Sequence, residues 1–236
     1  AMKFGIIKER KNPPDRRVVF TPEELVRLQS EHPEAEIKVE SSDIRIFSDD
    51  QYRNLGLNVT AEMSDCDVLF GVKEVPVDAL IPNKKYFFFS HTIKKQPYNR
   101  KLLKAILDKN IELYDHETIV DATNHRLIGF GRYAGLVGAY NGFRGFGIKY
   151  DLFTLPKAET LSGKEDLIAR LKRQTLPNIK IVLTGHGKVG MGAKEILDGI
   201  KIKQVSVEDF LNKNYTEPVY TQIDVLDYNK RIDGQV

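Results

Sequence analysis

Three apolar runs of the chain are each followed by side chains that can bind ions or transfer protons: Lys73 and Glu74, then His91, then Asp115 and Glu117. Lysine and histidine exchange protons near neutral pH when burial or nearby charge tunes their pKa values. Arg16 and Arg17 follow the first turn of the chain, and arginine binds a carboxylate through a two-pronged contact. The set suits a small zwitterionic substrate. A solvated Lys-Glu turn and a hydrogen-bonded core histidine are the alternative interpretations.

A second candidate functional site is the glycine-rich turn that begins at Gly185. The apolar run 179–183 predicts a buried strand, the turn has G-x-G-x-x-G spacing, and a helical pattern follows at 193–197. In that context the turn is typical of a dinucleotide site, because its backbone can approach a pyrophosphate and the helix N-terminus faces the negative charge. The residues expected to contact the cofactor are Gly185, His186, Gly187, Lys188, Val189 and Gly190.

An acid that binds the adenosine ribose is expected about 20 residues after such a turn. Residues 204–208 predict a second strand, and Glu208 at its end lies at about this spacing from Gly190. Glu208 favours NAD over NADP as the cofactor. Lys201 and Lys203 lie nearby, so NADP stays open.

The elements that must position these residues alternate between strand and helix, which predicts an α/β fold with parallel sheets covered on both faces. The carboxyl ends of parallel strands share one edge, where ligands bind. Thr21, Pro22 and Glu24 predict a helix start with an N-cap, a first-turn proline and a capping glutamate. Strands are predicted at 2–8, 37–40, 68–72, 86–90, 111–115 and 179–183, and further helices at 49–55, 96–110, 129–150 and 164–173.

The segment 129–150 is rich in glycine, with tyrosine and phenylalanine between the glycines. Small residues let a helix approach its neighbour closely, so we expect a tightly packed helix that also connects two domains. The predicted organisation is a substrate and catalytic domain at 2–132, a connecting helix and linker at 133–177, and the start of an NAD(P)-binding Rossmann domain at 178–236. The chain ends soon after the glycine turn, so we expect this second domain to be incomplete.

Composition excludes several classes of protein. A net charge of +3 gives no reason to expect a nucleic-acid partner, and the longest apolar run, 86–89, is too short to cross a bilayer. No signal peptide is visible at the N-terminus. Cys66 is the single cysteine, which rules out an internal disulfide, and the histidines lack metal-ligand spacing. We expect a cytoplasmic protein without a metal.

Together the motifs resemble the alanine dehydrogenase and saccharopine dehydrogenase (lysine-forming) superfamily, whose N-terminal domain is also similar to that of nicotinamide nucleotide transhydrogenase. The sequence Phe-Phe-Ser-His-Thr-Ile-Lys, followed by Phe-Gly-x-x-Ala-Gly, is most similar to saccharopine-forming enzymes and to lysine–ketoglutarate reductase. The matching segments run in family order along nearly the whole chain: 5–9, 17–22, 73–76, 87–92, 114–117, 126–135 and the glycine turn.

The resemblance implies two Rossmann-like domains with an active site in the cleft between them. It implies hydride transfer between a nicotinamide cofactor and the Cα of an amino acid or secondary amine. Lys73 would handle the amine proton, and His91 would act in water addition to the imine and its collapse. Arg17 and Arg126 would hold substrate carboxylates, and the electrostatics around the acid/base pair would be set by Glu74 and Glu117.

Within this resemblance we expect a saccharopine dehydrogenase, which releases lysine and 2-oxoglutarate. An alanine-type dehydrogenase, which releases pyruvate and ammonia, is a close variant. A dinucleotide-binding sensor without chemistry is the alternative from another class. The pair Lys73 and His91 favours an enzyme, because a sensor needs neither group. The expected partner is a small amino-acid substrate, and a homo-oligomer stays open because the family includes monomers and hexamers.

Overall fold

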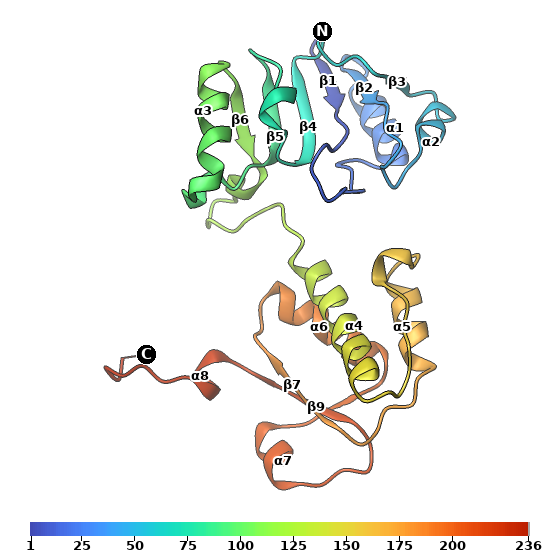
Figure 1. The fold of residues 1–236 in the computed structure, drawn as a ribbon, viewed down its shortest axis with the longest axis vertical. Helices are drawn as coiled ribbons and strands as arrows, with labels where there is room; N and C mark the ends of the chain where they lie inside the picture. Colours follow the sequence, from blue (N-terminus) through green and yellow to red (C-terminus); the bar gives the residue numbers. More distant parts are fainter. Residues whose placement is uncertain (236) are drawn as a thin grey trace. The chain divides into compact units, whose positions relative to one another are not determined.

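The computed structural model describes residues 1–235. Residue contacts divide the chain into two compact units, Ala1–Gly129 and Phe130–Val236. The first runs from blue to green in Figure 1 and the second from green to red. The division falls close to the expected end of the first domain at residue 132. It places the segment 133–177, expected as a connection, within the second unit.

A six-stranded parallel sheet in the order β3-β2-β1-β4-β5-β6 forms the centre of the first unit (Figure 1). The carboxyl ends of all its strands therefore lie at one edge. The short β3 was not predicted, because three residues are too few to show a pattern. The strands are β1 (Lys3–Ile6), β2 (Glu36–Glu40), β3 (Asn58–Thr60), β4 (Val68–Lys73), β5 (Lys85–Phe89) and β6 (Glu112–Asp115).

Helices cover the two faces of this sheet. They are α1 (Pro22–Glu31), α2 (Asp49–Arg53) and α3 (Arg100–Asp108). Leu25 of α1 packs in a cluster with Phe70, whereas Leu102 of α3 packs with Leu69. Leu69 and Phe70 are successive residues of β4 and point to opposite faces, so α1 and α3 lie on opposite sides of the sheet.

The predicted helix start at Thr21 is confirmed. The Thr21 hydroxyl accepts a hydrogen bond from the Glu24 backbone at 3.2 Å, and the Glu24 carboxylate accepts one from the Thr21 backbone at 3.0 Å. This reciprocal pair satisfies two backbone donors that would otherwise lack partners. It fixes the point where the chain leaves the Arg17 loop and enters α1.

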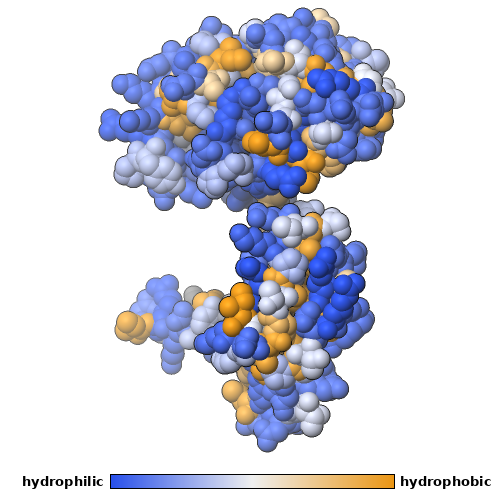
Figure 2. All heavy atoms as spheres, turned by 45° about the vertical axis from the view of Figure 1, so that its right-hand side comes forward, coloured by the Kyte–Doolittle hydropathy of each residue, from blue (hydrophilic) through white to orange (hydrophobic). Residues whose placement is uncertain are grey.

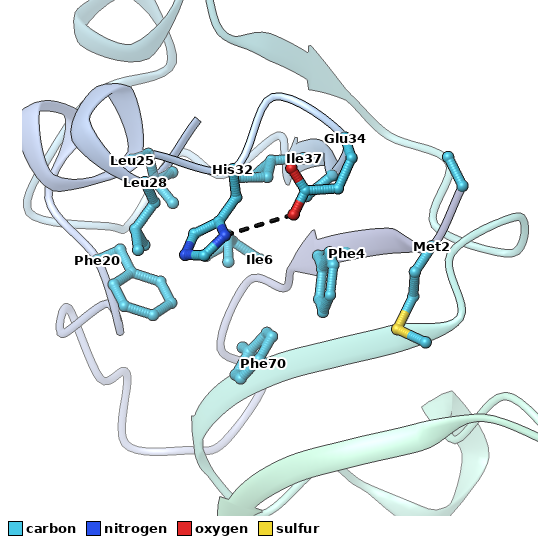
Figure 3. A pocket seen from close by; sticks show the side chains of 12 residues that line it. Met2, Phe4, Ile6, Phe20, Leu25, Leu28, His32, Glu34, Ile37 and Phe70 are labelled. Atoms are coloured by element: carbon cyan, nitrogen blue, oxygen red, sulfur yellow. Dashed lines mark ion pairs between the residues drawn. The ribbon is translucent and has the colours of Figure 1, made fainter. Parts of the chain in front are cut away.

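An apolar cavity of about 480 Å³ lies beside α1 (Figure 3). Phe4, Phe20 and Phe70 line it, together with residues that precede β1 and β2, so it opens toward the amino ends of the strands. Among the described side chains that line it, only His32 and Glu34 are ionisable, and they pair with each other at 3.4 Å. The cavity therefore lies away from the edge where the candidate catalytic residues were expected.

The second unit contains a three-stranded parallel sheet in the order β7-β9-β8. The predicted strand at 204–208 is wrong, because β8 ends at Gln204. Ser206 then starts a helix by accepting a hydrogen bond from the Asp209 backbone at 3.1 Å. The elements are α4 (Gly131–Lys149), α5 (Lys164–Lys172), β7 (Lys180–Thr184), α6 (Lys188–Gly199), β8 (Lys203–Gln204), α7 (Val207–Asn212), β9 (Val219–Ile223) and α8 (Val225–Tyr228).

The tight packing expected of the glycine-rich helix is confirmed. A Cβ on Gly135 of α4 would lie 2.0 Å from the Val189 carbonyl oxygen of α6. A Cβ on Gly192 of α6 would lie 2.1 Å from the Arg132 carbonyl oxygen of α4. The two backbones are thus in direct contact, which only glycine permits at these positions.

Apolar atoms reach the surface of the second unit in a band bordered by hydrophilic atoms (Figure 2). On β7, Val182 is 49% exposed, although strands of parallel sheets are usually buried on both faces. The three-stranded sheet therefore leaves part of one face open beside α4. None of the helices in residues 1–235 combines the length and the apolar composition needed to span a membrane.

Candidate active site and dinucleotide turn

Lys73 and His91 come from neighbouring strands at one edge of the first sheet. Lys73 is the last residue of β4 and lies opposite Phe89, the last residue of β5. His91 follows Phe89 after a single residue. Since neighbouring strands lie about 4.8 Å apart, the two residues emerge side by side.

The backbone of His91 adopts a left-handed conformation, with φ of 57°. A residue with a side chain is held in this region at a cost of about 1–3 kcal/mol, and such strain is concentrated at functional sites. The Ser90 hydroxyl donates to the Asp115 carboxylate, and the Asn99 amide donates to the His91 carbonyl at 3.2 Å. These contacts hold the turn and therefore fix the backbone from which the imidazole projects.

Glu117 lies between the imidazole of His91 and the ammonium group of Lys94. Its carboxylate is 3.3 Å from His91 Nδ1 and 3.4 Å from Lys94 Nζ, and its side chain is only 13% exposed. The Glu117 backbone donates to the Asp115 carboxylate at 2.9 Å, so Asp115 holds both the Ser90 turn and the start of the short helix that carries Glu117. Glu117 Oε2 and His91 Nδ1 are buried and have no hydrogen-bond partner among the described residues, so the carboxylate acts on the imidazole through its charge and stabilises positive charge on the ring.

Glu9 holds the backbone of Lys73. Its carboxylate accepts hydrogen bonds from Lys73 N at 2.5 Å and from Val72 N at 3.2 Å, beyond the point where β1 has ended. Burial raises the pKa of Glu9, and the hydrogen bonds from Lys73 and Val72 offset part of that shift. Glu9 thus replaces a missing strand partner at the point where the candidate catalytic lysine leaves the sheet.

Arg17 is held by Asp15. Arg17 Nη2 and Nε donate to the two oxygens of Asp15 at 2.7 and 3.0 Å. The hydrogen bond to Arg17 lowers the pKa of Asp15, and the charge of Lys73 acts in the same direction. Arg17 and Asp15 therefore lie within electrostatic reach of the Lys73 edge.

The remaining expected residues of the first unit occupy different surroundings. The carboxylate of Glu74 pairs with Lys11 and is largely buried. Arg126 lies on the loop after β6, where it forms an isolated antiparallel bridge with Val120, and its guanidinium donates to the Ile128 carbonyl at 3.5 Å. His91 thus pairs with Glu117, whereas Glu74 pairs with Lys11 and Arg126 donates to the Ile128 carbonyl.

Three residues of this edge were missed in the sequence: Glu9, Asp15 and Lys94. Glu9 follows directly after the predicted strand 2–8, so the rule that selected Lys73 would also have selected Glu9. Lys94 and Asp15 lie in turns, and nothing in their spacing distinguishes them from solvated charges.

The glycine turn joins β7 to α6 in the predicted strand–turn–helix order. Gly185 has φ of +91°, and a Cβ on Gly190 would lie 2.4 Å from the Gly185 carbonyl oxygen. Among residues 1–235, in contrast, a Cβ on Gly187 would meet nothing within 4 Å, and no side chain caps the start of α6. Open space beside uncapped backbone N–H groups fits a pyrophosphate. The turn also carries His186, Lys188 and Val189.

Glu208 does not lie at a strand end next to this turn. It is in the first turn of α7, which follows β8, and β9 separates β8 from β7. The expectation assumed that the second strand of the unit would pair with the first. Here the third strand, β9, takes that place.

Comparison with known proteins defines the class. Residues 5–137 match the family model described as alanine dehydrogenase/PNT, N-terminal domain. This match spans more than half of the chain, which therefore belongs to this family.

Individual curated proteins are similar to this chain over most of its length. The chain is 31% identical over 214 residues to alpha-aminoadipic semialdehyde synthase of Arabidopsis thaliana, covering 81% of this chain and 20% of the relative. It is 27% identical over 192 residues to saccharopine dehydrogenase (NAD(+), L-lysine-forming) of Yarrowia lipolytica, covering 73% and 51%. The chain thus spans between about a fifth and about half the length of these curated relatives.

Solved structures confirm the α/β, Rossmann-like fold. An L-alanine dehydrogenase matches with a TM-score of 0.62 at 20% identity, over 93% of this chain and 60% of that one. A transhydrogenase from Sinorhizobium meliloti matches with a TM-score of 0.61 at 16% identity, over 92% and 64%.

Proposed function

We propose that this chain supplies the acid/base residues and the glycine turn of an NAD(P)-dependent dehydrogenase that interconverts saccharopine with lysine and 2-oxoglutarate. The observation that carries the proposal is the placement of Lys73 and His91 at adjacent strand ends, with Glu117 3.3 Å from the imidazole. The names of the curated relatives support the choice of saccharopine.

The reaction needs two acid/base groups because it breaks a C–N bond through an imine. Oxidation of the secondary amine removes a hydride from carbon and a proton from nitrogen, and Lys73 takes that proton. Water then adds to the imine carbon: His91 takes one proton from the water, and Lys73 returns its proton to the imine nitrogen, which leaves a neutral carbinolamine. When the C–N bond breaks, His91 gives its proton to the departing amine nitrogen of lysine, and Lys73 takes the proton of the hydroxyl that becomes the carbonyl of 2-oxoglutarate. A nicotinamide cofactor, when bound, accepts the hydride.

Charged neighbours stabilise the protonated form of His91 and position Lys73. Glu117 stabilises the imidazolium that forms when His91 takes a proton, and Glu9 fixes the point where Lys73 leaves β4. Arg17, oriented by Asp15, is proposed to hold a substrate carboxylate, with Arg126 on the loop after β6 as a second contact. Glu74 is proposed to moderate the charge of this edge through its pair with Lys11.

The test is NADH and NADPH oxidation by the full-length protein. Lysine plus 2-oxoglutarate should give turnover, and omission of either one should abolish it. Turnover only with pyruvate plus ammonium would instead identify an alanine-type dehydrogenase. Dinucleotide binding without turnover on either pair of substrates would support a sensor and contradict the proposal.

A further inference from the structure

We propose that His116 is a positioning residue that fixes the backbone from which Lys73 enters the candidate active site. Its imidazole reaches from the end of β6 across β5 to β4, where it bonds to the backbone two residues before Lys73. This inference rests on the proposed function, because its effect on Lys73 is read from turnover.

An irregularity in β4 lies directly before Lys73. Phe70 lies opposite Phe87 of β5. Three residues later along β4, Lys73 lies opposite Phe89, only two residues further along β5. One extra residue in a strand forms a β-bulge, which disrupts the ladder locally and re-aims the side chain beside it. The direction of Lys73 therefore depends on the contacts that hold this bulge.

His116 holds the bulge from the side of β6. Its Nε2 lies 2.9 Å from the carbonyl oxygen of Gly71, which is the residue after Phe70. A carbonyl oxygen only accepts hydrogen bonds, so Nε2 carries the ring proton and is the donor. From the side of β1, the Glu9 carboxylate accepts hydrogen bonds from the next two backbone N–H groups. One side chain on each side thus fixes the backbone of the bulge.

The bond from Nε2 is the only hydrogen bond of the imidazole among the described residues. His116 is 5% exposed, and its ring lies 5.1 Å from that of Phe89, measured between centroids. Nδ1 is buried and has no hydrogen-bond partner in the described part of the chain. A buried nitrogen without a partner destabilises the folded state, so an apolar side chain would fill this space at a lower cost. The contribution of the imidazole is therefore the bond from Nε2.

The three residues at the end of β6 contact both halves of the candidate acid/base pair. Asp115 accepts hydrogen bonds from the turn that precedes His91, and Glu117 lies 3.3 Å from the His91 imidazole. His116, between them, bonds to the bulge that precedes Lys73. Loss of that bond should therefore shift Lys73 relative to His91. A displacement of about 1 Å at a reacting group can reduce turnover by about 10²-fold.

The test compares three substitutions of His116 in the full-length protein, with whichever of the two substrate pairs supports turnover. His116→Leu removes the donor and should lower kcat by about tenfold to a hundredfold, while the dissociation constant of the dinucleotide stays within about twofold of wild type. His116→Gln should keep kcat within about threefold of wild type, because its amide nitrogen can take the place of Nε2. His116→Asn places its amide nitrogen near the position of Nδ1 and should resemble His116→Leu.

His32→Leu is the matched control, because His32 lines the cavity at the amino ends of the strands and should not affect kcat. Wild-type kcat in His116→Leu, or equal kcat values for His116→Gln and His116→Asn, would overturn the inference and leave the proposed dehydrogenase intact. Turnover of the wild type with neither substrate pair would contradict the proposed function. Urea denaturation of each variant separates a loss of stability from a loss of kcat.

The protonation of the ring tests the hydrogen bond without any turnover. In imidazole nitrogen NMR spectra of the full-length protein, the signal that disappears in His116→Gln should report a proton on Nε2. A neutral ring with its proton on Nδ1 would overturn the inference, whether or not the protein is active. This measurement also decides the matter if His116→Leu fails to fold.

Discussion

At the ends of β4 and β5 the chain presents charged side chains, whereas at the end of β7 it presents bare backbone. In the first unit, Lys73 and His91 are held by other side chains, namely Glu9, Asp115 and Glu117. In the second unit, the turn is shaped by glycines whose missing Cβ atoms allow backbone to touch backbone. Both arrangements stand at the carboxyl edge of a parallel sheet.

The two regions should differ in how amino-acid substitutions affect stability and activity. A side chain at a strand end can be replaced while the strand keeps its hydrogen bonds, so chemistry and stability separate. A glycine at a helix crossing cannot be replaced without moving the backbone, so packing and any binding at the turn change together. Substitutions at the strand ends of the first unit should therefore reduce turnover and leave stability unchanged, whereas substitutions of the packed glycines in the second unit should reduce stability.

The largest effect is expected for turnover in Lys73→Met and His91→Gln. Each should reduce kcat by about 10²–10⁴-fold, the usual contribution of a positioned acid or base. The dissociation constant of the dinucleotide and the unfolding midpoint should hardly change, because both side chains lie at the end of the first sheet. Steady-state kinetics and fluorescence titration of the full-length protein measure the two quantities.

A matched control is Lys85→Met, which makes the same change at the opposite end of β5. It should leave kcat unaltered, since Lys85 lies at the amino end of β5, where its ammonium group is 3.9 Å from Glu112. Unchanged turnover in both Lys73→Met and His91→Gln would remove the site assignment altogether.

The reverse pattern is expected for Gly135→Ala in α4. The new Cβ would lie 2.0 Å from the Val189 carbonyl oxygen, and a helix backbone cannot yield as a flexible side chain does. We expect a loss of about 1–3 kcal/mol or more in the free energy of unfolding, measured by urea denaturation. Gly138→Ala in the same helix meets nothing within 4 Å and should stabilise by up to about 1 kcal/mol. Similar stability of the two variants would show that α4 and α6 are not in contact.

A smaller effect is expected for Glu117→Gln, which keeps the shape of the side chain and removes its charge. Loss of the carboxylate 3.3 Å from His91 Nδ1 should lower kcat by about tenfold and leave the KM of the dinucleotide unchanged. Glu112→Gln, at the other end of β6, is the control. If Glu117→Asp fails to restore part of the activity while stability stays normal, charge is not what Glu117 contributes.

Much of the fold followed from local patterns. The helix start at Thr21 and the strands that end near Lys73, Phe89 and Asp115 were predicted, because capping residues and buried apolar runs act within a few residues. The strand β9 was not predicted. Its pairing with β7 depends on contacts between segments far apart in the sequence, which no local pattern records.

The candidate site divides in the same way. The spacing of glycines predicted the turn at Gly185, since the turn is local. The strand end beside the turn could not be found by spacing, because the order β7-β9-β8 decides which strand adjoins β7. Sequence placed both His91 and Glu117 at the carboxyl edge of the sheet, but the 3.3 Å distance between them depends on the pairing of β5 with β6.

The smallest effect is expected at Glu9, where the burial of a carboxylate should lower the free energy of unfolding. Burial raises the pKa of Glu9 above its ordinary value of 4.5, so between the two values the folded state binds more protons than the unfolded chain. Stability therefore falls as pH rises through this window, and the loss persists above it. Glu9→Gln carries no such cost and can still accept from Lys73 N, so its stability relative to wild type should rise from pH 4 to neutral pH and then level off. Urea denaturation across this range measures the difference, with the exposed Glu31→Gln as control. A difference that is flat, or that falls with pH, would mean that the hydrogen bonds from Val72 and Lys73 outweigh the burial of the charge.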